Sequence, residues 1–239
     1  MSLMNKIIGD NLHLKGPNVS KAPACMVDLS GTTLYLPTPK QTLMIQTEVQ
    51  QTRFDIYNLD LFYKWERDQN SMSLDIHRNG WELKGRLGRS IGYTCLNVQL
   101  IKVREQKESS NFFNPNNLKA WLLRYAEESW GKSNQRKIEE HHGKAPKKYL
   151  WTYPLSDEHL FNICQKEEGF YFYTSRPSEG LTTSYWIPIS KGHVLLFNFV
   201  SNPIDCDFYS PEHNLPEATE QFIQEFMRNV KITSSPEAL

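Results

Sequence analysis

Residues 169–201 read GFYFYTSRPSEGLTTSYWIPISKGHVLLFNFVS, and this stretch decides the fold class. Strands are predicted at 170–174, 182–189 and 194–201, because aromatic and β-branched residues are concentrated there. Only residues 190–193, which contain the turn Ser190-Lys191-Gly192, separate the last two strands. A parallel crossover needs a dozen or more residues, so these two strands must be antiparallel neighbours.

Two more strands are predicted before this stretch, at 149–153 and 159–165. The links that follow them, 154–157 and 166–169, are also too short for a parallel crossover. The expected class is therefore α+β with mainly antiparallel sheet, rather than α/β.

The first hundred residues also alternate apolar and polar side chains. Strands are predicted at 26–29, 32–36, 43–49 and 96–103. The strongest local signal is Asn79-Gly80, because apolar residues alternate over 72–76 before it and 81–87 after it. Asn-Gly tolerates the positive φ of a two-residue turn, so we predict a hairpin at this dipeptide.

Two principal amphipathic helices are expected to cover the sheet. The first spans about 115–130, where Asn114-Pro115 has the chemistry of a helix start and Gly131 could supply a left-handed stop. The second spans about 216–229 and carries an apolar stripe at helical spacing.

Each half of the chain is thus a run of strands followed by one helix. The expected organisation is a strand-rich part over 1–110 and a second part over 111–239. The two parts could also form one continuous domain.

The order of elements in the second half resembles a known fold group. The segments are HLFNIC at 159–164, GFYFYT at 169–174, GHVLLFNFVS at 192–201 and a closing helix at 217–229 that leads into Val230-Lys231-Ile232. Over residues 115–232 this order is similar to the ending of PsbP/Mog1-like proteins, in which helices sandwich an antiparallel sheet. Members of that group are mostly non-enzymatic binding or accessory proteins, so the resemblance implies no catalytic residues.

The composition is that of a folded chain. Among 239 residues, 39% are hydrophobic and 12% aromatic, which excludes a disordered protein. The 27 basic and 27 acidic residues cancel, which argues against a dedicated nucleic-acid binder. The cancellation is uneven: residues 1–156 hold 22 basic and 15 acidic residues, and 157–239 hold 5 and 12. Segments of +7 and −7 could support head-to-tail self-association.

No run approaches eighteen consecutive apolar residues, so no membrane span is expected. The chain shows no secretory signal and its four cysteines form no C-x-x-C pair, so a cytoplasmic location is expected, unless a leader ahead of Met4 has been removed. Glu139 and His142 would share a helix face, but a structural metal needs more ligands than one such pair. No metal and no cofactor are therefore expected.

Gly88-Arg89-Ser90-Ile91-Gly92 matches the G-x-S-x-G motif, which in serine hydrolases presents the nucleophile on a strand-to-helix turn. Here the alternation over 96–100 predicts a following strand instead of a helix. A glycine-permissive link between strands is one interpretation. A hydrolase that uses Ser90 is the alternative.

Cys206 gives a second hydrolase alternative, with His213 as its partner. A cysteine near a histidine can act as a nucleophile when its pKa is lowered. The neighbouring Asp205 and Asp207 would instead raise the pKa of the thiol. A partly buried loop thiol is the other interpretation.

Four cationic residues surround the predicted hairpin: Arg78, Lys84, Arg86 and Arg89. They could form a patch that binds an anion or a partner. Glu82 shares a strand face with Lys84 and could neutralise part of that charge. The other interpretation is a solvated strand face.

Tyr171 and Tyr173 lie on one face of their predicted strand, and phenylalanines lie on the other. A strand that is aromatic on both faces is expected to be central and covered on both sides. The alternative is that the tyrosine face stacks sugar rings or bases.

The expected function is that of a non-enzymatic binding or interaction protein, acting through a protein partner or a small ligand. The alternative is the hydrolase that uses Ser90 or Cys206. A histidine nitrogen within about 3–4 Å of either nucleophile would favour the enzyme.

Overall fold

The computed structural model describes residues 12–43, 51–64, 71–85, 87–103, 111–146, 149–165, 168–175 and 179–234. Its main sheet contains seven antiparallel strands in the order β4-β5-β6-β10-β9-β8-β7. Their bounds are Tyr63–Lys64 (β4), Ser71–Lys84 (β5), Ser90–Val103 (β6), Phe161–Gln165 (β7), Glu168–Ser175 (β8), Leu181–Ser190 (β9) and His193–Pro203 (β10). The expected antiparallel pairing of β9 with β10 is confirmed.

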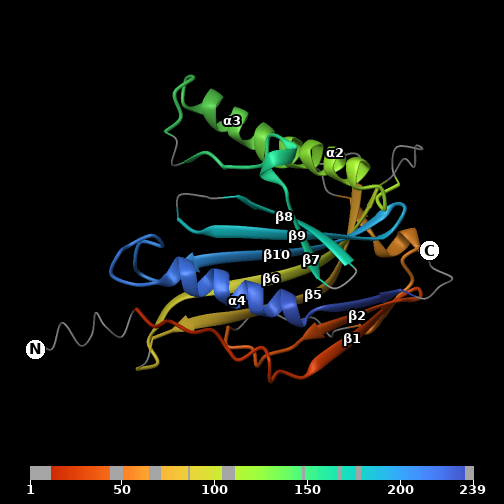
Figure 1. Cartoon of the computed structure of the whole chain (residues 1–239). Helices are drawn as coiled ribbons and strands as arrows, with labels where there is room; N and C mark the ends of the chain where they lie inside the picture. The colour runs from red at the N-terminus through yellow and green to blue at the C-terminus, as the bar shows by residue number, and fades with distance from the viewer. Residues whose placement is uncertain are drawn as a thin grey trace, which may run out of the picture.

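A second, smaller sheet lies beside the first (Figure 1). Its order is β11-β2-β1-β3, with bounds Ala24–Leu29 (β1), Thr32–Pro37 (β2), Arg53–Phe54 (β3) and Lys231–Ser234 (β11). Only β1 and β3 are parallel neighbours among these strands. The α+β class is confirmed. The strand predicted at 43–49 falls, apart from Leu43, outside the described residues.

The helices are α2 (Pro115–Ala126), a π-helical turn η3 (Glu127–Gly131), α3 (Lys132–Glu140) and α4 (Leu215–Asn229). Two short 3-10 helices lie at Leu59–Leu61 (η1) and Asp157–His159 (η5). No helix in the described part of the chain is both long and apolar enough to cross a membrane.

The helical stop predicted at Gly131 is wrong, because helical turns continue through this residue into α3. Gly131 has right-handed φ and ψ, and the carboxylate of Glu127 occupies the space that a Cβ would need. The absence of a Cβ at Gly131 therefore permits the Glu127 carboxylate to lie close to the helix backbone. The left-handed stop comes later, at His142 and Gly143, which both have positive φ.

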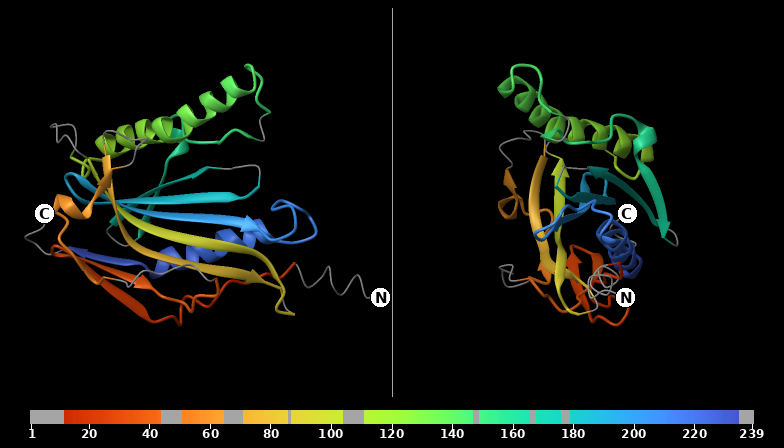
Figure 2. Two further views of the ribbon diagram at one scale, coloured as in Figure 1. Left: turned by 180° about the vertical axis from the view of Figure 1, so that it is seen from behind. Right: turned by 90° about the vertical axis from the view of Figure 1, so that its left-hand side faces the viewer.

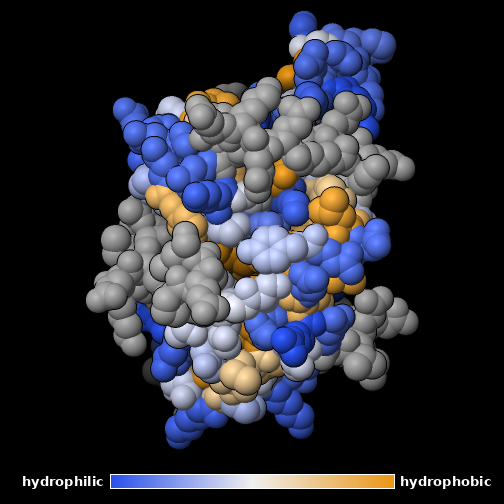
Figure 3. All heavy atoms as spheres, turned by 90° about the vertical axis from the view of Figure 1, so that its right-hand side faces the viewer, coloured by the Kyte–Doolittle hydropathy of each residue, from blue (hydrophilic) through white to orange (hydrophobic). Residues whose placement is uncertain are grey.

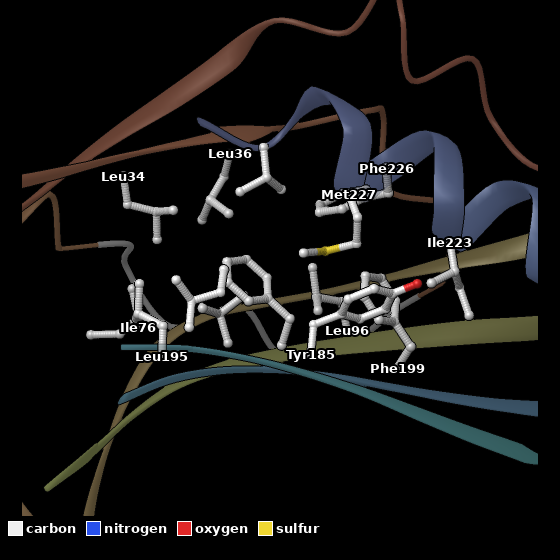
Figure 4. Packing of buried hydrophobic residues seen from close by; sticks show 14 of the residues in the cluster. Leu34, Leu36, Ile76, Leu96, Tyr185, Leu195, Phe199, Ile223, Phe226 and Met227 are labelled. Carbon is white, nitrogen blue, oxygen red and sulfur yellow. The ribbon is translucent and has the colours of Figure 1, made fainter. Parts of the chain in front are cut away.

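Two cores pack against opposite faces of the main sheet. The inner core joins α4 and the small sheet to one face, with Leu34 and Leu36 from β2 facing Phe226 and Met227 from α4 (Figure 4). The outer core packs α2, through Trp121, against the other face. Figure 2 shows the helical run of α2 and α3 on one side of the sheet and α4 with the small sheet on the other.

The main sheet combines strands from both halves of the chain. β6 pairs with β10 along eleven residue pairs, from Gly92 with Pro203 to Lys102 with His193. The inner core likewise contains Val27 from the first half and Phe222 from the last helix. The halves are thus joined by both hydrogen bonds and burial.

The hairpin predicted at Asn79-Gly80 is wrong. Both residues lie inside the continuous strand β5, where Asn79 pairs with Leu96 and Gly80 with Cys95. The chain turns instead at 85–89, where Gly88 has a φ of 82°. The long pairing with β6, which buries alternate side chains of both strands, overrides the local turn preference of the dipeptide.

Candidate functional site

A pocket of about 610 Å³ opens where an N-terminal segment meets the end of β5. It is lined by His13, Lys15, Gly16, Pro17, Thr42, Glu82, Lys84 and Gly85. Trp81 and Leu83 point into the inner core. Because side chains alternate along a strand, Glu82 and Lys84 lie on the opposite face of the main sheet. The volume is within the range typical of small-molecule sites.

Two lysines face each other at this pocket. The backbone N–H of Lys15 donates to the carbonyl of Lys84 and that of Lys84 to the carbonyl of Lys15, each at 3.0 Å. Residues that exchange both hydrogen bonds lie directly opposite, with their side chains on the same side. The sheet therefore holds two ammonium-bearing side chains next to each other.

Glu82 is the carboxylate of the pocket. Its Oε2 lies 2.8 Å from Lys84 Nζ, and its Oε1 accepts a hydrogen bond from Ser90 Oγ at 2.7 Å. Its backbone N–H donates to Thr42 Oγ1 at 2.7 Å. The hydrogen bonds from Lys84 and Ser90 lower the pKa of the Glu82 carboxyl, so it is ionised at neutral pH.

Of the four cationic residues that the sequence grouped, the structure does not bring Arg78 and Arg89 to the pocket with Lys84. Arg78 forms an ion pair with Asp75 on its own strand, six residues before Lys84. Only Lys84 of the group lines the pocket. Arg86 lies outside the described residues, and Arg89 is placed beyond the end of β5 in the turn.

Tyr171 and Tyr173 are covered by the helices. Only 6% and 1% of their surfaces are exposed, and both belong to the outer core. The ring of Tyr173 lies 5.2 Å from that of Trp130, and Lys119 Nζ lies 5.9 Å from the Tyr171 ring. In this arrangement the tyrosine face packs against the helices and presents no surface on which a sugar or a base could stack.

Ser90 begins strand β6 rather than a helix. Its hydroxyl donates to Glu82, and no hydrogen bond to a histidine is found for it in the described structure. Because the pKa of Glu82 is lowered, this carboxylate is a weak base. The geometry thus gives Ser90 a partner that orients it without activating it.

Cys206 and His213 are not paired either. The Cys206 thiol donates to the carbonyl of Ile91 at 3.5 Å, and its pKa is raised, chiefly by partial burial. His213 Nε2 lies 2.8 Å from the carbonyl of Asp207, while its Nδ1 accepts from the Leu215 N–H. Both ring nitrogens of His213 are therefore occupied by the backbone.

The structure reveals a serine–histidine contact that the sequence did not indicate. Ser190 Oγ lies 2.7 Å from His193 Nδ1, and His193 Nε2 lies 3.1 Å from the carbonyl of Ile56. Burial lowers the pKa of His193 to about 4, so it too is a weak base. Gly192 N–H also donates to Ser190 Oγ, which marks the pair as part of a tight turn.

Glu139 and His142 do not form part of a metal site in the described structure, where no three or more potential ligands gather. Glu139 instead accepts a hydrogen bond from Gln135. Sequence reasoning identified Lys84 but missed His13 and Lys15, because only the bridge between distant segments brings them to the pocket.

Comparisons with known protein families, with curated proteins and with solved structures find no match for this chain.

Proposed function

We propose that the chain is a non-enzymatic binding protein and that the pocket beside Lys15 and Lys84 holds a small ligand. The pocket carries this proposal, because it combines a suitable volume with charged groups fixed by backbone pairing. Concave sites with a few convergent polar groups are the usual binding sites of folded proteins.

The alternative of a hydrolase is less well supported by the same geometry. A nucleophile needs a base within reach, with a pKa near the working pH. Ser90 faces a carboxylate of lowered pKa, and Cys206 has a raised pKa and no imidazole partner. Binding needs neither feature.

The resemblance of residues 115–232 to PsbP/Mog1-like proteins supports the same proposal. That fold group consists mostly of binding and accessory proteins. The pocket here lies outside the resembling segment, at residues 13–17, 42 and 82–85. The ligand specificity would therefore be a property of the first half of the chain.

A pocket-filling variant tests the proposal. Benzoate, benzamide and benzylamine, which differ mainly in charge, are titrated while amide chemical shifts are followed by NMR. We expect at least one probe to shift the amides of residues 13–16 and 82–85. In His13→Trp, the indole should occupy the pocket and weaken that binding at least tenfold.

Asn116→Trp provides the matched control, because Asn116 is exposed on α2, away from the pocket. It should bind the probe as the unmodified protein does. The proposal is wrong if none of the three probes shifts the pocket amides, or if His13→Trp binds the probe unchanged.

A further inference from the structure

We propose that the ligand carries an oxyanion, a carboxylate or a phosphate, which binds between the ammonium groups of Lys15 and Lys84. This inference rests on the proposed binding function and specifies its chemistry. It follows from the charges that the fold holds together at the pocket.

Lys15 and Lys84 lie opposite each other across the bridge, with their side chains on one face. Like charges directly opposite each other on a sheet are destabilising, and Glu82 compensates only the Lys84 side of this pair. An anion seated between them would turn this repulsion into two favourable charge-assisted hydrogen bonds.

The side chains that line the pocket carry an unbalanced charge. Its ionisable side chains are His13, Lys15, Glu82 and Lys84. Glu82 contacts Lys84, whereas Lys15 has no ion pair among the described residues. Among the described residues of the lining, Lys15, Glu82 and Lys84 together carry one uncompensated positive charge. A ligand with a single negative charge would neutralise it.

Contacts of Glu82 hold the site in shape. Both oxygens of Glu82 are engaged, one by Lys84 and the other by Ser90. These contacts fix the Lys84 ammonium at the pocket wall. Thr42 Oγ1 accepts from the Glu82 N–H, so its own hydroxyl proton stays available to an anion.

Glu82 also competes with the ligand for Lys84. Its carboxylate repels an incoming anion at close range. Replacing it with glutamine removes the competing charge and retains the size of the side chain. We therefore expect Glu82→Gln to bind anions more tightly than the unmodified protein.

The test compares probes of one shape and different charge. Benzoate, phenyl phosphate, neutral benzamide and cationic benzylamine are titrated by NMR at about 0.15 M salt, where long-range electrostatics are screened. We expect benzoate, phenyl phosphate or both to bind at least tenfold more tightly than benzamide. The two anions distinguish a carboxylate site from a phosphate site.

Lysine variants locate the charge. Lys15→Met should weaken anion binding at least fivefold and leave benzamide binding unchanged. Lys84→Met should act in the same direction, and Glu82→Gln should strengthen anion binding. Lys191→Met is the control, because Lys191 is exposed, as Lys15 is, but lies in the β9–β10 turn.

The outcomes separate this inference from the proposed function. If benzamide or benzylamine binds in the pocket as tightly as the anions, the pocket is a binding site but the oxyanion assignment is wrong. It is also wrong if Lys15→Met leaves anion binding unchanged. If no probe reaches the pocket, both proposals fail together.

Discussion

His77 and His193 are two buried imidazoles whose environment opposes protonation. Only 3% and 2% of their surfaces are exposed, and burial lowers the pKa of each to about 4. His77 Nε2 has no hydrogen-bond partner in the described structure. The positive charge of Lys102 also lowers the pKa of His193.

The buried histidines make stability fall in acid. Between about pH 6.5 and pH 4 the unfolded chain binds protons that the folded chain does not, so protonation favours unfolding. From pH 7 to pH 5, each histidine should remove about 2 kcal/mol of unfolding free energy. Between pH 7 and pH 5, we expect the free energy of unfolding of His77→Leu to fall by about 2 kcal/mol less than that of the unmodified protein.

Urea denaturation at pH 7 and pH 5 measures this difference. His141→Leu is the control, because it removes an exposed imidazole at the C-terminal end of α3. An unaltered pH dependence in His77→Leu would show that His77 is not buried as the neutral imidazole.

At the scale of elements, α3 is held by polar contacts rather than by burial. It contains no buried residue. The segment 149–153, predicted as a strand, is instead an irregular strap along α3. The side chain of Asn134 binds both backbone groups of Trp151, at 2.7 and 2.8 Å, and Lys137 Nζ donates to the Tyr149 carbonyl.

The strand prediction at 149–153 failed for a physical reason. Its aromatic residues favour a sheet, but here they pack on a helix: the Tyr149 ring stacks on His141, and Trp151 lies under Lys137. The backbone groups that a strand would pair are partly satisfied by Asn134 and Lys137. Local composition alone does not distinguish these two environments.

Asn134→Ala should loosen the strap without unfolding the protein. The loss of two hydrogen bonds to the Trp151 backbone should cost about 1–2 kcal/mol locally. We expect the Trp151 amide to exchange with solvent at least fivefold faster, while the global unfolding midpoint stays nearly unchanged. Hydrogen exchange followed by NMR gives both readings.

Gln135→Ala is the neighbouring control, since Gln135 is exposed and bonds only Glu139 on the same helix. Equal acceleration of Trp151 exchange in both variants would contradict the role given to Asn134.

At the scale of the whole molecule, α4 joins the two sheets. Phe226 is fully buried, and its ring lies 5.5 Å from both Trp81 of β5 and Phe199 of β10. The same face of α4 meets the small sheet (Figure 4). The helix therefore contributes to one core shared by strands from both halves of the chain.

The coloured surface in Figure 3 shows hydrophobic residues in small separate patches among hydrophilic ones. Large contiguous apolar patches on a surface usually mark sites of interaction with proteins, membranes or ligands. No large apolar patch is seen on the coloured surface of this face.

Phe226→Ala should destabilise both sheets together. Removing a buried phenylalanine typically lowers the free energy of unfolding by about 3–5 kcal/mol. Because Phe226 contacts strands of the main sheet and belongs to the core shared with the small sheet, we expect one cooperative transition at a lower midpoint. Tryptophan fluorescence and far-UV circular dichroism, followed during urea denaturation, should report coincident curves.

Gln224→Ala is the matched control, because Gln224 lies on the exposed face of the same helix. Two separate transitions in the unmodified protein would show that the chain consists of independently folding parts, such as 1–110 and 111–239.

The positions of most strands and of α4 could be predicted from the sequence. Strands expected at 182–189 and 194–201 are observed at Leu181–Ser190 and His193–Pro203, and a helix expected at 216–229 is observed at Leu215–Asn229. These elements have strong local patterns, in which apolar spacing and short links leave one arrangement.

The candidate site could be predicted only in part. Lys84 was identified as a cationic residue of the first half, but its expected companions Arg78 and Arg89 do not join it at the pocket. The group rested on a hairpin at Asn79-Gly80 that the structure does not contain. The free energy that a dipeptide gains from its preferred turn is small compared with that of a long, buried pairing of two strands.

The sequence by itself determined the α+β class and the antiparallel pairing of β9 with β10, because both follow from residue spacing over short ranges. Only the tertiary structure decided which charges meet. Lys15 faces Lys84 through a bridge between segments that are far apart in the chain, and Glu82 is held by Ser90 from the neighbouring strand. Such contacts depend on register and burial across the whole sheet, which no local pattern specifies.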